Sequence, residues 1–287
     1  MNYEVSDVYS LDLQSVAKRI YYSLIYRSTF YKFLNEKYIG EVRSAGTPMI
    51  EILKSADATV NVRETKEITS ALTPALQGYS SVKVDLTDLP MDYSIRIPLL
   101  VSGTNFVNTL EDVMDKKDAA VAAHIDTYGF GVLAADTDID EEAWAPADAA
   151  GYITALNGLK AKLFNNNVFD SYRLGLSATE YANLTSALTT ILKFETMTGV
   201  EGVDRGVIAN AYGVEIFAIN DNMLDDVKGY FFNPIAVVGD TFFDSFAQYP
   251  GNYPGFPGYY VMEGNILFGC KVVEPRAIIR LQETVSA

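Results

Sequence analysis

Apolar and polar residues alternate along the chain with two different periods. Between residues 11 and 38, apolar side chains such as Leu13, Val16 and Ile20 recur every three or four residues. This spacing predicts an amphipathic helix with at most one break. A narrower stripe over residues 108–128 has charged residues on its far side. It predicts a long helix that lies across a sheet and ends at Gly129 and Gly131.

The region between residues 40 and 100 alternates with the period of two that is typical of half-exposed strands. Val60 and Val62 alternate with polar residues, and so do the apolar residues of 82–86. A polar stretch containing Pro74 and Gly78 separates these two runs. The pattern predicts a long two-stranded excursion with a polar tip. Such an excursion has little core of its own, so it depends on packing against something else.

The remainder of the chain mixes short helical and strand patterns. Residues 132–150 have the polar composition of a loop or linker, and Ser177 and Glu180 have the spacing of a capping box. Because the patterns lack a regular βαβ order, they predict an α+β fold. The expected elements are a helix at 149–164, a strand at 172–176, a helix at 178–192, strands at 214–219 and 230–238, a Gly/Pro/aromatic loop at 240–258, and a closing hairpin at 259–281 that turns near Gly264 and Asn265.

Composition limits the chemistry that this chain can perform. Its 287 residues include one His (His124), one Cys (Cys270) and one Trp. A Ser-His-Asp triad could use only His124, and a structural zinc site needs more Cys and His ligands than the chain contains. The phosphate-loop pattern, the dinucleotide-binding glycine pattern and the nucleophile elbow are all absent from the sequence. The residues therefore predict no cofactor and single out no catalytic group.

The individual candidates for chemistry have simpler explanations. Asp136, Asp138 and Asp140 match the first half of a calcium loop, but Glu141 stands where that loop requires glycine. These three residues are weak metal candidates, and a solvated acidic loop is the favoured interpretation. His124 is expected on a helix surface, and Cys270 as a small buried residue in a strand. The 37 acidic residues leave a carboxylate-dependent hydrolase open as an alternative.

Charge is distributed unevenly along the chain. The 22 Lys and Arg against 37 Asp and Glu give a net charge of −15, and nearly all of the acidic excess lies beyond residue 90. A mildly basic N-terminal segment could bind the acidic body of a second copy, although a solvated helix face is the simpler alternative. No signal peptide, membrane span or basic nucleic-acid footprint is recognised. The candidate contacts between copies are Lys18, Arg19, Arg27, Arg63, Glu64, Lys66 and Glu67.

The order of these elements resembles the major capsid proteins of tailed bacteriophages, which have the HK97 fold. The segment GEVRSAGTPMIEI (40–52) looks like the start of that family's extended E-loop, and VKVDLTDLPMDYSIRIP (82–98) like its return strand. NTLEDVMDKKDAAVAAHIDTYGFGVLA (108–134) resembles its long spine helix. The most specific piece is ITALNGLKAKLFNNNVFDSYRLGLSATEYANL (153–184), which resembles the beginning of the axial domain. LFGCKVVEPRAIIRL (267–281) resembles the closing strands of the peripheral domain.

The resemblance implies an HK97-like division of the chain. The implied segments are an N-terminal arm and helix (1–39), the E-loop with flanking P-domain strands (40–100), the P-domain spine helix and linker (101–147), the A-domain (148–254), and the closing P-domain strands (255–287).

The resemblance also implies a structural role without enzymatic activity. Pentamers and hexamers of the subunit would assemble in the host cytoplasm into the icosahedral capsid of a virion. The shell would enclose double-stranded DNA without sequence-specific binding, aided by a scaffolding protein and a portal, and with no membrane. Three alternatives remain open, namely an encapsulin-type nanocompartment shell, another virion component such as a tail or decoration protein, and the hydrolase.

Overall fold

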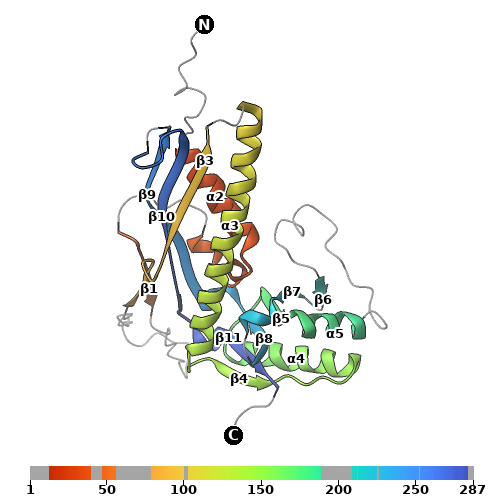
Figure 1. Cartoon of the computed structure of the whole chain (residues 1–287). Coiled ribbons are helices and arrows are strands. Elements are labelled where there is room, and N and C mark those ends of the chain that lie inside the picture. The colour runs from red at the N-terminus through yellow and green to blue at the C-terminus, as the bar shows by residue number, and fades with distance from the viewer. Residues whose placement is uncertain are drawn as a thin grey trace, which may run out of the picture.

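A computed structural model describes residues 13–39, 47–55, 79–99, 103–188, 209–211, 213–224, 226–251 and 253–283. Figure 1 shows an elongated part, in which the long helix α3 runs beside a three-stranded sheet, and a second part that carries α4 and α5 at one end. The chain combines helices with antiparallel and mixed sheets, so the predicted α+β class is confirmed.

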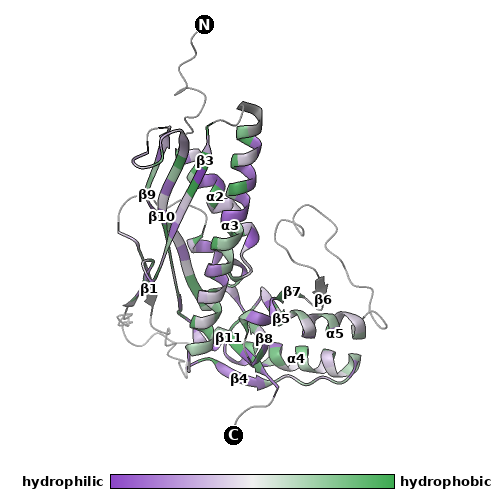
Figure 2. Cartoon of the chain, in the orientation of Figure 1, coloured by the Kyte–Doolittle hydropathy of each residue, from purple (hydrophilic) through white to green (hydrophobic). Residues whose placement is uncertain are grey.

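The elongated part is a sheet covered by two helices. Its antiparallel strands follow the order β3 (Leu89–Pro98), β10 (Tyr259–Val272) and β9 (Val237–Pro250). Helix α3 (Gly103–Ala135) packs against β3 and β10, and α2 (Leu13–Arg27) packs against α3 and β9. Hydrophobic and hydrophilic residues alternate around α3 in Figure 2, as expected of a helix that buries one side. The predicted helix across a sheet is thus confirmed.

Helix α3 is longer than predicted, because Gly129 and Gly131 lie inside it. Gly129 provides close approach rather than a helix end, since a Cβ at this position would collide with the ring of Phe30. Beyond the helix, Arg280 donates hydrogen bonds to the carbonyl oxygens of Leu133, Ala134 and Asp136. These bonds satisfy acceptors that the end of a helix leaves free.

The second part is built on a six-stranded mixed sheet of order β4-β11-β8-β5-β7-β6. Most of its predicted elements are present, and Ser177 Oγ accepts a hydrogen bond from the backbone N–H of Glu180, as the capping box requires. Inside the predicted 132–150 linker, β4 pairs in parallel with β11. The bounds are β4 (Asp140–Ala143), α4 (Ala149–Asn165), β5 (Tyr172–Ser177), α5 (Ala178–Leu188), β6 (Ala209–Ala211), β7 (Val214–Ile219), β8 (Val227–Phe232) and β11 (Ile278–Gln282).

The closing hairpin was predicted at the wrong place. The strand predicted at 230–238 is the end of β8 followed, after a short turn, by the start of β9, and most of the predicted 240–258 loop belongs to β9. Residues 259–272 form one strand, and its hairpin partner is β9. Gly264 marks a bulge where the pairing register shifts, and the ring of Phe246 occupies the space of its missing side chain. A glycine in a strand that approaches another group this closely resembles a turn glycine in sequence.

Candidate assembly surfaces

The segment after α2 is anchored by a buried carboxylate on α3. Asp126 accepts hydrogen bonds from Ser28 Oγ at 2.5 Å and from the backbone N–H groups of Thr29 at 3.1 Å and Phe30 at 2.9 Å. Burial raises the pKa of Asp126, while these bonds and the nearby Lys32 oppose the rise. The carboxylate therefore holds the start of the short helix η1 (Phe30–Lys32) against α3.

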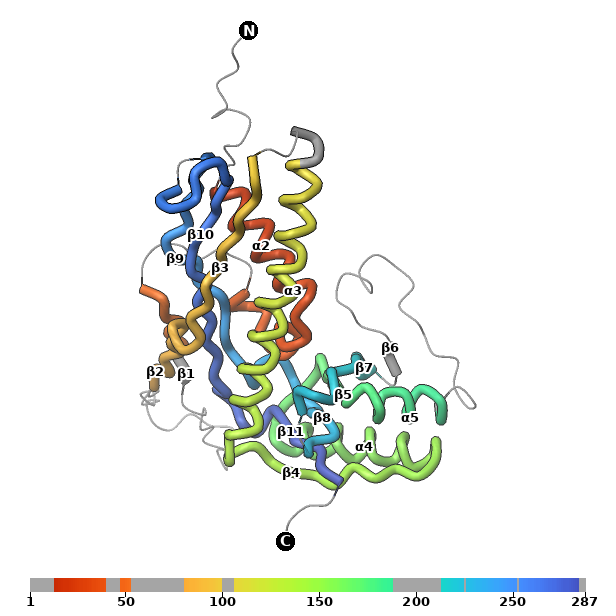
Figure 3. The backbone as a smooth tube through the Cα atoms, viewed as in Figure 1, coloured from red at the N-terminus to blue at the C-terminus, as the bar shows by residue number. Residues whose placement is uncertain are grey.

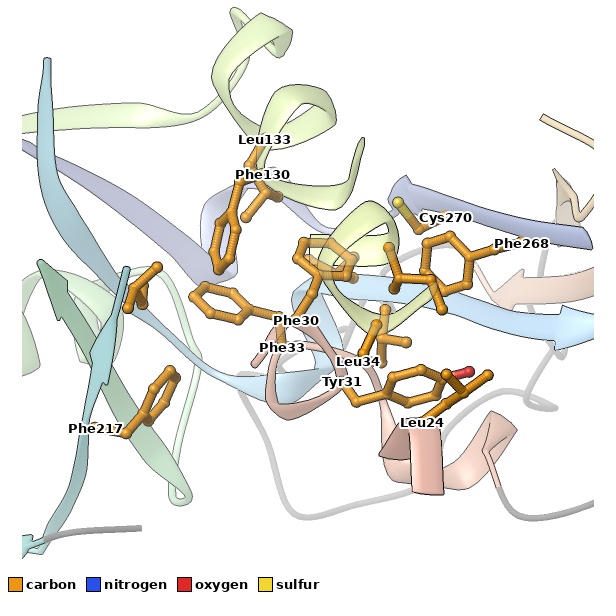
Figure 4. Packing of buried hydrophobic residues seen from close by; sticks show 14 of the residues in the cluster. Leu24, Phe30, Tyr31, Phe33, Leu34, Phe130, Leu133, Phe217, Phe268 and Cys270 are labelled. Atoms are coloured by element: carbon orange, nitrogen blue, oxygen red, sulfur yellow. The ribbon is translucent and has the colours of Figure 1, made fainter. Parts of the chain in front are cut away.

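Two rings of this segment join the two parts of the molecule. Phe33 stacks on Phe232 with ring centroids 4.0 Å apart and meets Phe217 edge to face at 5.7 Å. Phe30 makes a similar edge contact with Phe130 of α3 at 5.4 Å. Figure 4 shows Phe30 and Phe33 between Phe217 on one side and the Phe268 strand on the other. The N-terminal segment is thus the centre of a core shared by both sheets.

Arg173 at the start of β5 fixes the place where this segment leaves the core. Its Nε donates to Glu215 at 2.8 Å, and its Nη2 donates to Glu36 at 2.6 Å. Its Nη1 donates to the backbone carbonyl of Lys32 at 2.8 Å. The arginine side chain is only 10% exposed, and its partner Glu215 is less exposed than Glu36, so the bond to Glu215 is the better shielded from water. These partners are distant in the sequence, so no local pattern predicts the contacts.

The basic residues of α2 have partners within the chain. The guanidinium groups of Arg19 and Arg27 lie 3.4 and 3.5 Å from the same carboxylate oxygen of Asp115 on α3, and Lys18 is exposed. Within 13–39, the segment therefore packs onto its own chain, because the apolar face of α2 is buried in the core against α3 and β9. Contact of Lys18, Arg19 and Arg27 with a second copy stays a prediction. Arg63, Glu64, Lys66 and Glu67 lie outside the described residues.

The base of the predicted two-stranded excursion is present. Strands β1 (Met49–Ser55) and β2 (Tyr79–Asp85) pair antiparallel, with Met49 opposite Asp85. Figure 3 shows this pair on the side of the three-stranded sheet that faces away from α2 and α3. The strand predicted around Val60 and Val62 lies outside the described residues.

A small second core attaches this two-stranded ribbon to the sheet. At the centre of this core, the backbone at Asp85 passes directly over Gly269 of β10. The carbonyl of Asp85 occupies the space that a Cβ at position 269 would need. The ribbon thus has little core of its own, as its sequence pattern predicts. The core consists of Ile50, Ile52, Val84 and Leu86 of the ribbon segment, packed on Val238, Phe242 and Val273.

The sequence candidates for chemistry are not brought together. The carboxylate of Asp136 accepts a bond from the backbone N–H of Asp138, and within the described ranges no group of three His, Cys, Asp or Glu could hold a metal ion. His124 is exposed on α3, whereas Asp126 points toward Ser28. Cys270 is buried as predicted, and burial raises the pKa of its thiol. None of the described helices is long and apolar enough to cross a membrane.

Comparison with known proteins shows which solved structures have a similar fold. No protein-family model matches the sequence, and no curated protein matches it. Solved structures do match. The capsid of Ralstonia phage GP4 superposes with a TM-score of 0.60 and 9% identity, covering 87% of each chain. The capsid structure of cyanophage P-SCSP1u gives 0.58 at 15% identity, covering 85% of this chain and 86% of that one. A chain of Mycobacterium phage Che8 gives 0.55 at 15% identity, covering 90% and 92%.

These matches extend over nearly the whole of both chains, so the likeness includes the sheets, the long helix and the part that carries α4 and α5. At such low identity it concerns the fold. The chain therefore has the HK97-like fold of phage capsid subunits, as its sequence resemblance predicts.

Proposed function

We propose that this protein is a capsid shell subunit of a phage, one that assembles into pentamers and hexamers around double-stranded DNA. The observation that carries the proposal is the β1–β2 ribbon. One small core holds it to the face of the three-stranded sheet that lies away from α2 and α3. A two-stranded ribbon that is attached by so small a core gains stability when it packs on a neighbouring copy. The capsid fold along the chain supports the same role.

The proposed role is structural and non-enzymatic. The likeness to capsid chains supports this role, and the described residues include no group of three His, Cys, Asp or Glu that could hold a metal ion. The net charge of −15 also suits a shell around DNA, because an acidic surface repels packed phosphates and leaves them free to slide. Assembly in the host cytoplasm, a scaffolding protein and a portal are parts of this proposal.

We propose the segment roles from the same fold. Residues 40–100 act as the E-loop with its flanking strands, 101–147 as the spine helix and linker, 148–254 as the A-domain and 255–287 as the closing strands. Lys18, Arg19 and Arg27 are proposed to contact a neighbouring copy along the exposed side of α2.

Electron microscopy of the purified protein and of particles from lysates tests the proposal. Closed shells with hexameric and pentameric units are expected, and shells from lysates should protect double-stranded DNA from nuclease. Shells that contain enzymes in place of DNA would support the nanocompartment alternative. A protein that stays monomeric at high concentration and enters no particle would rule out the shell role.

A deletion tests the ribbon itself. Removal of residues 64–80 should leave soluble subunits that fail to form stable shells, because the neighbour contacts of the ribbon are lost. Gly131→Ala, a substitution in α3 with no atom within 4 Å of the new Cβ, is the control that should assemble normally. Normal shells from the deletion variant would mean that the ribbon makes no essential contact.

A further inference from the structure

The turn that joins β9 to β10 is tightly built. Gly251, Gly255 and Gly258 have φ values of 85°, 85° and 82°, a left-handed conformation that favours glycine. The backbone N–H of Gly251 donates to the carbonyl of Tyr259 at 2.9 Å, and the N–H of Leu99 donates to the carbonyl of Gly258 at 2.9 Å. The second bond ties the turn to the end of β3. These bonds fix the backbone at Gly251 and Gly258.

Aromatic rings form a continuous row along this turn. Tyr249 meets Tyr253 at 5.1 Å between centroids, Tyr253 stacks on Phe256 at 6.1 Å, and Phe256 meets Tyr259 at 6.4 Å. The hydroxyl of Tyr253 donates to Glu263 at 2.9 Å, so the carboxylate beside the row is already bonded. Phe256, which lies between Tyr253 and Tyr259 in the row, remains 41% exposed.

Arg96 of β3 lies against this row. Its guanidinium carbon is 4.3 Å from the centroid of Phe256 and 5.5 Å from that of Tyr259, which are cation–π distances. The side chain is exposed. Ring contacts restrict the face of the guanidinium but leave its N–H groups, which point along the edge of the plane, available for hydrogen bonding.

Arg96 differs in one respect from the other arginines of the described ranges. The others each form an ion pair with an acidic side chain of their own chain, and Arg96 forms none with a described residue. A planar guanidinium that is already held by rings loses little conformational freedom when it binds, and its paired N–H groups match a carboxylate. The others are Arg19, Arg27, Arg173, Arg276 and Arg280.

We propose that Arg96, held by Phe256 and Tyr259, binds a surface carboxylate of a second copy of this chain. Charge complementarity favours this occupant, because the acidic excess beyond residue 90 gives every copy many carboxylates. The inference rests on the proposed function, which places identical copies side by side. Because the turn and its acceptor are different surfaces, the contact would be heterologous, and repetition of it can close a ring.

Assembly of purified subunits in the absence of DNA tests this contact. Arg96→Ala should raise the subunit concentration at which shells form by about tenfold, the loss expected for one charge-assisted pair. Phe256→Leu keeps an apolar side chain but removes the ring face, and should give a smaller increase. Arg276→Ala removes an exposed arginine that is paired with Glu274 of its own chain and should assemble as the wild type does.

Cross-linking then identifies the acceptor. Assembled Arg96→Lys subunits, mixed from ¹⁵N-labelled and unlabelled copies, are treated with a carbodiimide, which joins an amine to a carboxylate in direct contact. Mass spectrometry should find mixed-label peptides that link position 96 to an Asp or Glu of another copy.

Three results would overturn the inference. One is unchanged assembly of Arg96→Ala, and another is cross-links to Glu263 of the same copy only. The third is a defect that occurs only in DNA-filled shells, which would identify phosphate as the ligand. Failure of the wild type to form any shell would instead count against the proposed function, which keeps the two ideas separable.

Discussion

The ring of Phe30 lies directly over the backbone of Gly129, in the space where any other residue of α3 would carry its Cβ. The two residues are 99 positions apart in sequence, and their contact brings η1 against the long helix. The contact explains why a helix of 33 residues tolerates glycine near its end, where alanine would have the better helix propensity.

Gly129→Ala should therefore destabilise the subunit. Overpacking against Phe30 is expected to cost about 1–3 kcal/mol, which exceeds the gain of about 1 kcal/mol in helix propensity. Gly131→Ala is the matched control, because no atom lies within 4 Å of its added Cβ, and it should stabilise by about 0.5–1 kcal/mol. Urea unfolding of both variants gives the free energies. Equal stabilisation by both would contradict the contact.

Asp118 gives a prediction about pH. Its carboxylate is fully buried and accepts a bond from Tyr93 at 2.8 Å, and burial raises its pKa despite that bond and the nearby Arg19. A raised pKa means that the folded state binds the proton more tightly than the unfolded state. The stability contributed by Asp118 is thus full below the ordinary aspartate pKa and is lost as pH rises through the raised value.

The measurement is urea unfolding of the wild type and Asp118→Asn across a pH series. The free energy of unfolding of the wild type minus that of the variant should fall as pH rises from about 4 toward 7. Asp112→Asn, which removes the exposed partner of Lys116, should show a difference below about 1 kcal/mol at every pH. A difference that rises with pH for Asp118→Asn would show that its pKa is lowered in the fold.

Gly269→Ala should detach the base of the ribbon. The added Cβ would meet the carbonyl of Asp85, so β2 must move away from β10 and the small core with Val238 and Phe242 must open. Hydrogen exchange of the subunit should show faster exchange in β1 and β2, while α3 keeps its protection. If β1 and β2 stay as protected as in the wild type, the ribbon is held by other contacts.

Arg173→Met should destabilise the subunit, because Arg173 bonds three acceptors from different parts of the chain. The substitution removes the donor that Glu215 and the carbonyl of Lys32 share and is expected to cost about 1.5–3 kcal/mol, the usual range for hydrogen bonds to charged groups. Arg173→Lys keeps the charge but cannot reach all three acceptors, so it should lose less. Thermal unfolding ranks the variants. A cost below about 1 kcal/mol for Arg173→Met would show that the three bonds contribute little.

Local signals in the sequence predicted the elements that depend on neighbours in the chain. The start of α5 follows from the three-residue spacing of Ser177 and Glu180, which meet in the structure. The wrong predictions have non-local causes. Ser245 adopts a positive φ of 52° in β9, and the interrupted alternation made a long strand resemble a loop. Gly264 resembled a turn because the Phe246 ring that fills its space lies 18 residues away.

For the candidate surfaces too, the sequence predicted the local patterns but not the long-range contacts. Alternation indicated a two-stranded excursion, but its attachment at Gly269 requires a contact between β2 and a strand almost 190 residues later. The basic residues of α2 were visible as a cluster, whereas their pairing with Asp115 depends on how α2 packs on α3. The sequence gives no sign that Arg96 is special. It differs from the other described arginines in forming no ion pair with a described acidic residue, and ion pairs depend on the folded structure.

The central position of Phe33 has a consequence for synthesis on the ribosome. Phe33 is translated well before the rings that enclose it, which include Phe217 and Phe232, and the neighbouring Leu34 bridges to Val237. The segment around Phe33 cannot pack in its final position until these late residues have been translated. The core that both sheets share can therefore close over Phe33 only late in synthesis, after β7 and β8 have been made.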